Sequence, residues 1–163
     1  MQSWKKELLY MDKNKGIEIL RENLEVSDKS LARLSESFLK CKEFGIKDEF
    51  SNQELTEFEA LTARFARTVD LFINKCLRSL YKVELEDTLT ILDLLNNAEK
   101  RGIIESAETW DYIKRLRNKI THDYDVDDFT NDIFKPILKY APIVESSIAK
   151  LKAYCEKYLA AKP

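Results

Sequence analysis

The stretch "SNQELTEFEALTARFARTVDLFINKCLRSL", residues 51–80, decides the fold because its apolar side chains keep a helical period without a break. At 3.6 residues per turn the stretch makes about eight helical turns, and its apolar side chains form one stripe. The stripe consists of Phe58, Leu61, Phe65, Val69, Phe72, Cys76 and Leu80. Ser51 and Glu54 have capping-box spacing. Phe50 can pack on Leu55 as a hydrophobic staple, so we expect a long central helix to begin here.

Amphipathic patterns on both sides predict further helices. Before the central helix, Leu31, Leu34, Phe38 and Cys41 form a stripe, with Ser27 as the expected N-cap and Gly45 as the C-terminal stop. After it come three more stripes, which are Leu89, Leu92, Leu95 and Ala98; Trp110, Ile113, Leu116 and Ile120; and Val144, Ile148, Leu151, Cys155 and Tyr158. The pattern is weakest over residues 1–25.

Turn and cap residues separate these predicted helices. Gly102 ends one helix and Ser106 can cap the next. "YDVDDF", residues 124–129, interrupts the helical pattern, and Pro136 and Pro142 are expected to start or kink helical segments. No segment has the pattern of a strand, and three glycines and three prolines are too few for a turn-rich sheet protein. We therefore predict one all-α domain over residues 1–163, an up-and-down bundle of five to six helices.

The composition limits the classes of function. The chain has 27 basic and 29 acidic side chains and a net charge of −2, so any contact with nucleic acid must be local. Three cysteines without CxxC spacing predict reduced core thiols rather than disulfides or a zinc site. No apolar run has the length of a signal-peptide core or a membrane span, so we expect a cytoplasmic protein with no membrane partner.

The only histidine lies in "RLRNKITHDY", residues 115–124. On a helical wheel the apolar side chains of this segment face one way. Arg117, Asn118, Thr121 and His122 face the other way, with Lys114 and Arg115 beside them and Tyr124 at the border. An imidazole can move protons near pH 7, and a guanidinium can hold phosphate oxygens in a bidentate manner. This set of side chains suits cleavage of RNA by its own 2′-hydroxyl group.

A second copy of the chain is needed for that reaction. The chemistry uses one base and one acid, and a chain with one histidine can supply two imidazoles only by pairing with itself. There is no Gly-rich phosphate loop and no second histidine for a metal, so we expect neither a metal nor a cofactor. The sequence therefore predicts a composite site at a homodimer interface.

Two motifs resemble known families. "RNKITHDY" resembles the Arg-x4-His-x-Tyr signature of HEPN-domain proteins, in particular HepT-type toxins, which are encoded beside minimal nucleotidyltransferase antitoxins. The matching residues are Arg117, His122 and Tyr124, with Asn118 after the arginine. "ARFARTVDLFINK" resembles the Arg-Phe-x-x-Thr-x-x-Leu pattern of the nucleotidyltransferase substrate-binding proteins. That match consists of Arg64, Phe65, Thr68 and Leu71, with Ala66 where that family carries an acidic residue.

The resemblance implies a HEPN-like homodimer that acts as a metal-independent endoribonuclease, the toxin of a toxin-antitoxin pair. Arg117 would bind the scissile phosphate and His122 would transfer protons. The side chains that would bind or orient the RNA are Asn118, Thr121 and Lys114. The cognate nucleotidyltransferase antitoxin would silence the enzyme by attaching adenylate to Tyr124, because a phosphate there competes with RNA for the arginine.

Other readings of the same residues stay open. The chain could be a non-catalytic substrate-binding or regulatory subunit of a minimal nucleotidyltransferase, or a helical adaptor with a degenerate motif. His122 could cap a helix, and Tyr124 could lie in the core. Arg117 could pair with Asp111 or Glu108. Arg64 and Arg67 could line an RNA groove or form salt bridges.

Overall fold

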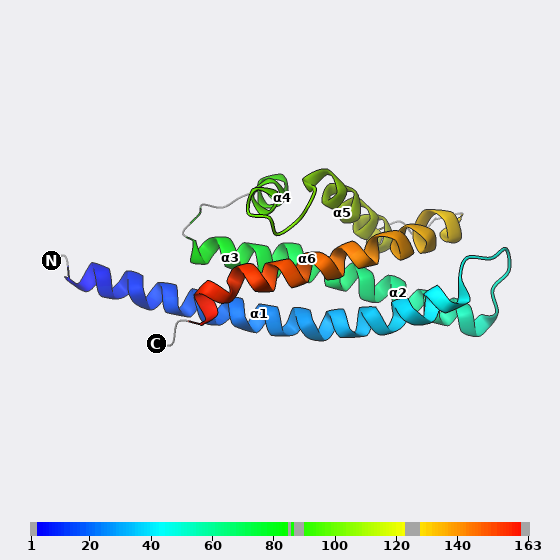
Figure 1. Cartoon of the computed structure of the whole chain (residues 1–163), viewed down its shortest axis with the longest axis horizontal. Coiled ribbons are helices and arrows are strands. Elements are labelled where there is room, and N and C mark those ends of the chain that lie inside the picture. The colour runs from blue at the N-terminus through cyan, green and yellow to red at the C-terminus, as the bar shows by residue number, and fades with distance from the viewer. Residues whose placement is uncertain (1–2, 85, 87–89, 123–127, 161–163) are drawn as a thin grey trace.

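Every regular element of the computed structural model, which describes residues 3–84, 86, 90–122 and 128–160, is helical (Figure 1). The elements are α1 (Ser3–Phe44), α2 (Asn52–Asp70), the π-helix η1 (Leu71–Leu77), α3 (Arg78–Val83), α4 (Ile91–Lys100), α5 (Ala107–His122), the π-helix η2 (Thr130–Phe134) and α6 (Lys135–Leu159). Because α2, η1 and α3 follow one another without a gap and η2 runs into α6, the described chain forms five continuous helices. The predicted all-α bundle is confirmed.

The three longest helices lie along one another, and the two shorter ones cover them. Figure 1 shows α1, α6 and the continuous α2–α3 helix along the long axis, with α4 and α5 on one side. The apolar stripe of α2–α3 is confirmed, since each of its predicted members is fully buried. α2 packs against α1, α5 and α6, so this helix holds the bundle together.

The first helix is longer than predicted. Ser27 is not an N-cap but lies inside α1, where its side chain is buried. The helix continues upstream because Leu20 and Leu24 extend the buried stripe and pack into the core. Gly45 ends α1 as predicted, with a φ of 69° that side-chain-bearing residues rarely adopt. Trp4 and Met11, near the start of α1, are exposed.

The start of α2 follows the predicted capping box. Ser51 Oγ accepts a hydrogen bond from the backbone N–H of Glu54 at 3.2 Å, and the Glu54 carboxylate accepts one from Ser51 at 2.9 Å. The staple partner differs from the prediction. The ring of Phe50 packs on Phe58, with centroids 5.1 Å apart, while Leu55 is exposed. Because Phe58 lies in the core, its contact with Phe50 sets the direction in which the chain enters α2.

The π-helix η1 in the middle of the central helix was not predicted. A π turn holds one residue more than an α turn, so it shifts the register of the side chains that follow. Ile73 and Leu77 are buried there together with the predicted Phe72 and Cys76. Both Ile73 and Leu77 are apolar, so the sequence tolerates the shifted register without exposing or burying a charge.

The prediction for α4 was partly wrong. Leu92 is exposed, whereas Leu94 is buried with Leu95 and Ala98, and Leu89 lies outside the described residues. The helix begins at a capping box made by Thr90 and Asp93, which sets its rotation. Its end at Gly102, with a φ of 71°, is confirmed.

The predicted cap of α5 and the predicted buried stripe of α6 are confirmed, but neither proline begins the continuous η2–α6 helix. Ser106 Oγ accepts a hydrogen bond from the N–H of Thr109 at 3.1 Å and so caps α5. Pro136 lies in the first turn of α6 and Pro142 lies inside it. The buried side chains of the α6 stripe are Val144, Ile148, Leu151 and Cys155, and Tyr158 is half-buried. α5 ends at His122, and the structure describes none of residues 123–127.

The three cysteines are buried free thiols, as the core prediction required. Burial raises the pKa of Cys41 to about 11 and those of Cys76 and Cys155 to about 12. Because the reactive form of cysteine is the thiolate, these side chains pack and do not act as nucleophiles.

Trp110 fastens α5 to the rest of the bundle. Its indole stacks on Phe72 of η1, with ring centroids 4.3 Å apart and an interplanar angle of 26°. Its Nε1–H donates to Ser147 Oγ of α6 at 3.0 Å, and that hydroxyl donates to the carbonyl of Ile143 at 2.7 Å. One side chain thus links three helices and fixes where the exposed face of α5 lies.

We expect Trp110→Ala to lower the free energy of unfolding by about 3–5 kcal/mol, because it leaves a large cavity and removes the hydrogen bond from the indole to Ser147. Urea unfolding followed by circular dichroism measures the change. Trp4→Ala is the control, since Trp4 is 50% exposed and its loss should cost little. Equal effects of the two substitutions would contradict this account of the core.

Candidate functional site

The predicted motif lies on α5 with its polar side chains outward. Ile113 and Leu116 are buried against the core, as the wheel predicted, and Ile120 is half-buried. Arg117 and Asn118 are half-buried at the edge of this face. Thr121 and His122 are exposed in the last turn of the helix. The helix therefore presents the motif beside the α2–α5 contact.

Arg117 is held by a carboxylate from the central helix. Its Nη2 donates to Oδ1 of Asp70 at 3.0 Å, and its Nη1 donates to Oδ1 of Asn118 at 3.0 Å. The alternative pairing of Arg117 with Asp111 or Glu108 is wrong. The Arg117 side chain is 26% exposed and that of Asp70 is 38% exposed, so the pair lies at the surface and is open to solvent.

Asp70 is the residue of this site that sequence reasoning missed. It is the last residue of α2, directly before η1, and its Oδ1 also accepts from Nδ2 of Asn74 at 2.9 Å. The spacing of four residues between Asp70 and Asn74 is visible in the sequence and places both on one face of a helix. What the sequence does not show is that α5 crosses α2 at this point.

The other polar side chains near the motif take different partners. Lys114 and Arg115 both pair with Asp111, at 3.6 Å and 3.2 Å, so Lys114 does not join Arg117. The hydroxyl of Thr121 donates to the backbone carbonyl of Arg117 at 2.9 Å. The structure thus brings Arg117 and Asn118 together, whereas the Thr121 hydroxyl is bound to the helix backbone.

Arg117 and His122 point in different directions from the same helix. Five residues correspond to about 7.5 Å along a helix and about 140° around it. Two side chains with this spacing on one helix therefore lie on separate parts of the surface of one chain. Tyr124, the predicted modification site, lies outside the described residues.

Within the described ranges, no cluster of three or more His, Cys, Asp or Glu side chains could hold a metal ion. No helix in that part of the chain is long and apolar enough to cross a membrane.

No protein-family model matches the chain, and no curated protein sequence matches it. The likeness to HEPN proteins rests on the motif residues alone.

We expect a weak coupling between Arg117 and Asp70. Both side chains are partly exposed, and such pairs contribute about 0.2–1 kcal/mol to stability. A double-mutant cycle with Arg117→Ala and Asp70→Ala measures the coupling by urea unfolding. The control pair is Arg101 with Glu84, each 16% exposed and joined at 3.3 Å, for which we expect a larger coupling. A larger coupling for Arg117 with Asp70 would mean that the ion pair serves the fold.

Proposed function

We propose that this chain is a HEPN-type toxin, a metal-independent endoribonuclease whose site is completed by a second copy. The proposal rests on the hydrogen bonds and the exposure of Arg117. Its guanidinium is oriented by Asp70 and Asn118, yet it stays at the surface. Of its five N–H groups, Nε–H and one on each terminal nitrogen have no partner among the described residues, so they can bind phosphate oxygens.

The proposed reaction needs a base and an acid. The base removes the proton of the RNA 2′-hydroxyl, the oxygen attacks the adjacent phosphorus, and the acid protonates the departing 5′-oxygen. The products are a 2′,3′-cyclic phosphate and a 5′-hydroxyl end. His122 of each chain supplies one of these two functions, and Arg117 stabilises the charge that develops on the phosphorane.

Asn118, Thr121 and Lys114 have supporting roles in this proposal. Asn118 holds the guanidinium and so positions it for the phosphate. Thr121 is exposed one helical turn from Arg117 and can meet the RNA backbone through its hydroxyl oxygen. Lys114, held by Asp111, contributes positive potential and not a direct contact. These roles place the substrate along the outer face of α5.

We expect His122→Ala to lower RNA cleavage by about 10²–10⁴, the size of a general acid–base contribution. Arg117→Ala should remove most activity, and Arg117→Lys should restore little, because an ammonium lacks the planar fork of a guanidinium. Gel analysis of labelled RNA in excess chelator measures cleavage and identifies the cyclic phosphate end. Arg115→Ala is the control, because this arginine is 66% exposed on the same helix and paired with Asp111.

The same samples test the composite site. Light scattering should give twice the mass of the 19.1 kDa chain for the wild type and for each variant. A strict monomer that still cleaves RNA would contradict the shared site. Full activity of the His122→Ala variant, or activity that depends on a divalent ion, would contradict the proposed mechanism.

We further propose that a cognate cytoplasmic nucleotidyltransferase silences the toxin by attaching adenylate to Tyr124. Co-expression with that partner should raise the intact mass by one adenylate and abolish cleavage, because the added phosphate competes for Arg117. Tyr124→Phe should block the mass increase. Tyr112→Phe is the control, since Tyr112 is exposed on α5. Adenylate that persists in the Tyr124→Phe variant would contradict the assignment.

A second candidate is a non-catalytic subunit that binds the substrate of a nucleotidyltransferase. The observation that favours it is the ion pair itself, since Asp70 already neutralises Arg117 and so weakens its attraction for a phosphate. If the chain binds nucleotides but does not cleave RNA, that result would favour this second candidate.

A further inference from the structure

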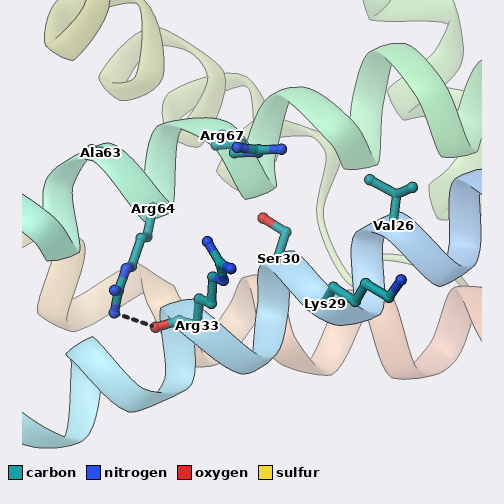
Figure 2. A pocket seen from close by; sticks show the side chains of 7 residues that line it. All are labelled: Val26, Lys29, Ser30, Arg33, Ala63, Arg64 and Arg67. Atoms are coloured by element: carbon teal, nitrogen blue, oxygen red, sulfur yellow. Dashed lines mark hydrogen bonds between the residues drawn. The ribbon is translucent and has the colours of Figure 1, made fainter.

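A cleft of about 340 Å³ lies between α1 and α2, and its polar lining is dominated by positive charge (Figure 2). Lys29 and Arg33 line it from α1, and Arg64 and Arg67 line it from α2. No carboxylate is among its lining residues. The chain as a whole has a net charge of −2, so this positive lining is a local feature of the cleft. Such a surface attracts anions.

Three acidic side chains close in sequence to the cleft residues pair with other cations. Asp28 pairs with Lys152 at 2.9 Å, and Glu36 lies 3.6 Å from Lys40. Asp70 pairs with Arg117. In the described part of the chain, none of the four cleft cations forms an ion pair, so the predicted alternative of salt bridges for Arg64 and Arg67 is wrong. Their charges are not neutralised within the fold.

Arg64 is fixed in place before any ligand binds. Its Nη1 donates to Ser37 Oγ at 2.6 Å and to the carbonyl of Arg33 at 3.2 Å, which Figure 2 shows as a dashed line. Ser37 is fully buried, so this guanidinium is anchored to the core side of α1. A side chain that is already ordered loses little entropy when it binds an anion. Arg33 and Arg67 are exposed and complete the cationic lining.

The cleft lies beside the candidate site. Arg67 and Asp70 are three residues apart on α2, so their Cβ atoms are about 5–6 Å apart on one side of the helix. Asp70 in turn holds Arg117. Arg67 of the cleft and Arg117 of the candidate site are therefore both neighbours of Asp70.

We propose that this cleft binds the sugar-phosphate backbone of single-stranded RNA and guides the strand to Arg117, an inference that rests on the proposed ribonuclease function. The cleft has no aromatic side chain to stack a base, and its apolar lining is Val26 and Ala63. Recognition is therefore through phosphates and is independent of sequence. Lys29 and Arg33 are about 6 Å apart along α1, which suits successive phosphates of an extended strand better than one mononucleotide.

The test uses the His122→Ala protein, which should bind RNA without cutting it. Fluorescence anisotropy with labelled oligo(U) and oligo(A) at several salt concentrations gives the affinity and its salt dependence. Adding Arg33→Ala and Arg67→Ala should weaken binding of both RNAs at least about tenfold and lower the salt slope by about 1.4, at 0.7 per phosphate contact. Arg64 is left in place because it also joins the helices.

The matched control removes two lysines outside the cleft. Lys100→Ala with Lys139→Ala takes away the same charge from exposed positions on α4 and α6, and binding should change little. Circular dichroism checks that both double variants keep the fold. Equal weakening by the two pairs would show a general charge effect and overturn the proposal.

The remaining outcomes separate this inference from the proposed function. An unchanged affinity and salt slope in the Arg33 and Arg67 double variant would overturn the proposal that the cleft binds RNA, even if the wild type cleaves RNA. Loss of RNA binding in that variant supports the cleft, even if the wild type shows no nuclease activity. Binding of ATP but not of either RNA overturns the cleft as an RNA track and favours a nucleotide site.

Discussion

The stacking of Trp110 on Phe72 is the contact on which the placement of the candidate site depends. It joins α5 to the middle of the central helix, and the indole hydrogen bond to Ser147 adds α6 to the same point. With α5 held there, Arg117 lies two turns further along the helix and faces Asp70. A shift of α5 along α2 would separate this pair, so the core fixes the surface chemistry.

The fold was largely predictable because it follows from periodicity. The stripe from Phe58 to Leu80 is buried as expected, and Gly45 and Gly102 end their helices with left-handed backbone angles. The errors have physical causes. Serine is a typical N-cap residue, which favours a cap at Ser27, yet a serine also fits inside a helix when its neighbours are buried. At α4, the cap at Thr90 sets the rotation of the helix and exposes Leu92.

The candidate site was predictable in part. The helical wheel placed Arg117 and His122 on the outer face, because the facing of residues within one helix depends on spacing alone. It gave no information on Asp70, which comes from another helix and meets Arg117 only because the two helices cross. Lys114 shows a different limit, since a wheel places it on the outer face but does not say that it pairs with Asp111 on its own helix.

The buried cysteines give the protein an internal reporter of its own opening. Cys41 lies in α1, Cys76 in η1 and Cys155 in α6, so each thiol samples a different helix. Their raised pKa values keep them protonated and unreactive while the helices stay packed. The rate at which an alkylating agent modifies each cysteine therefore measures the local unfolding of the helix that carries it, without any engineered label. The rate at Cys76 reports on the π-helix that follows Asp70, which makes the motion beside the site measurable in the natural sequence.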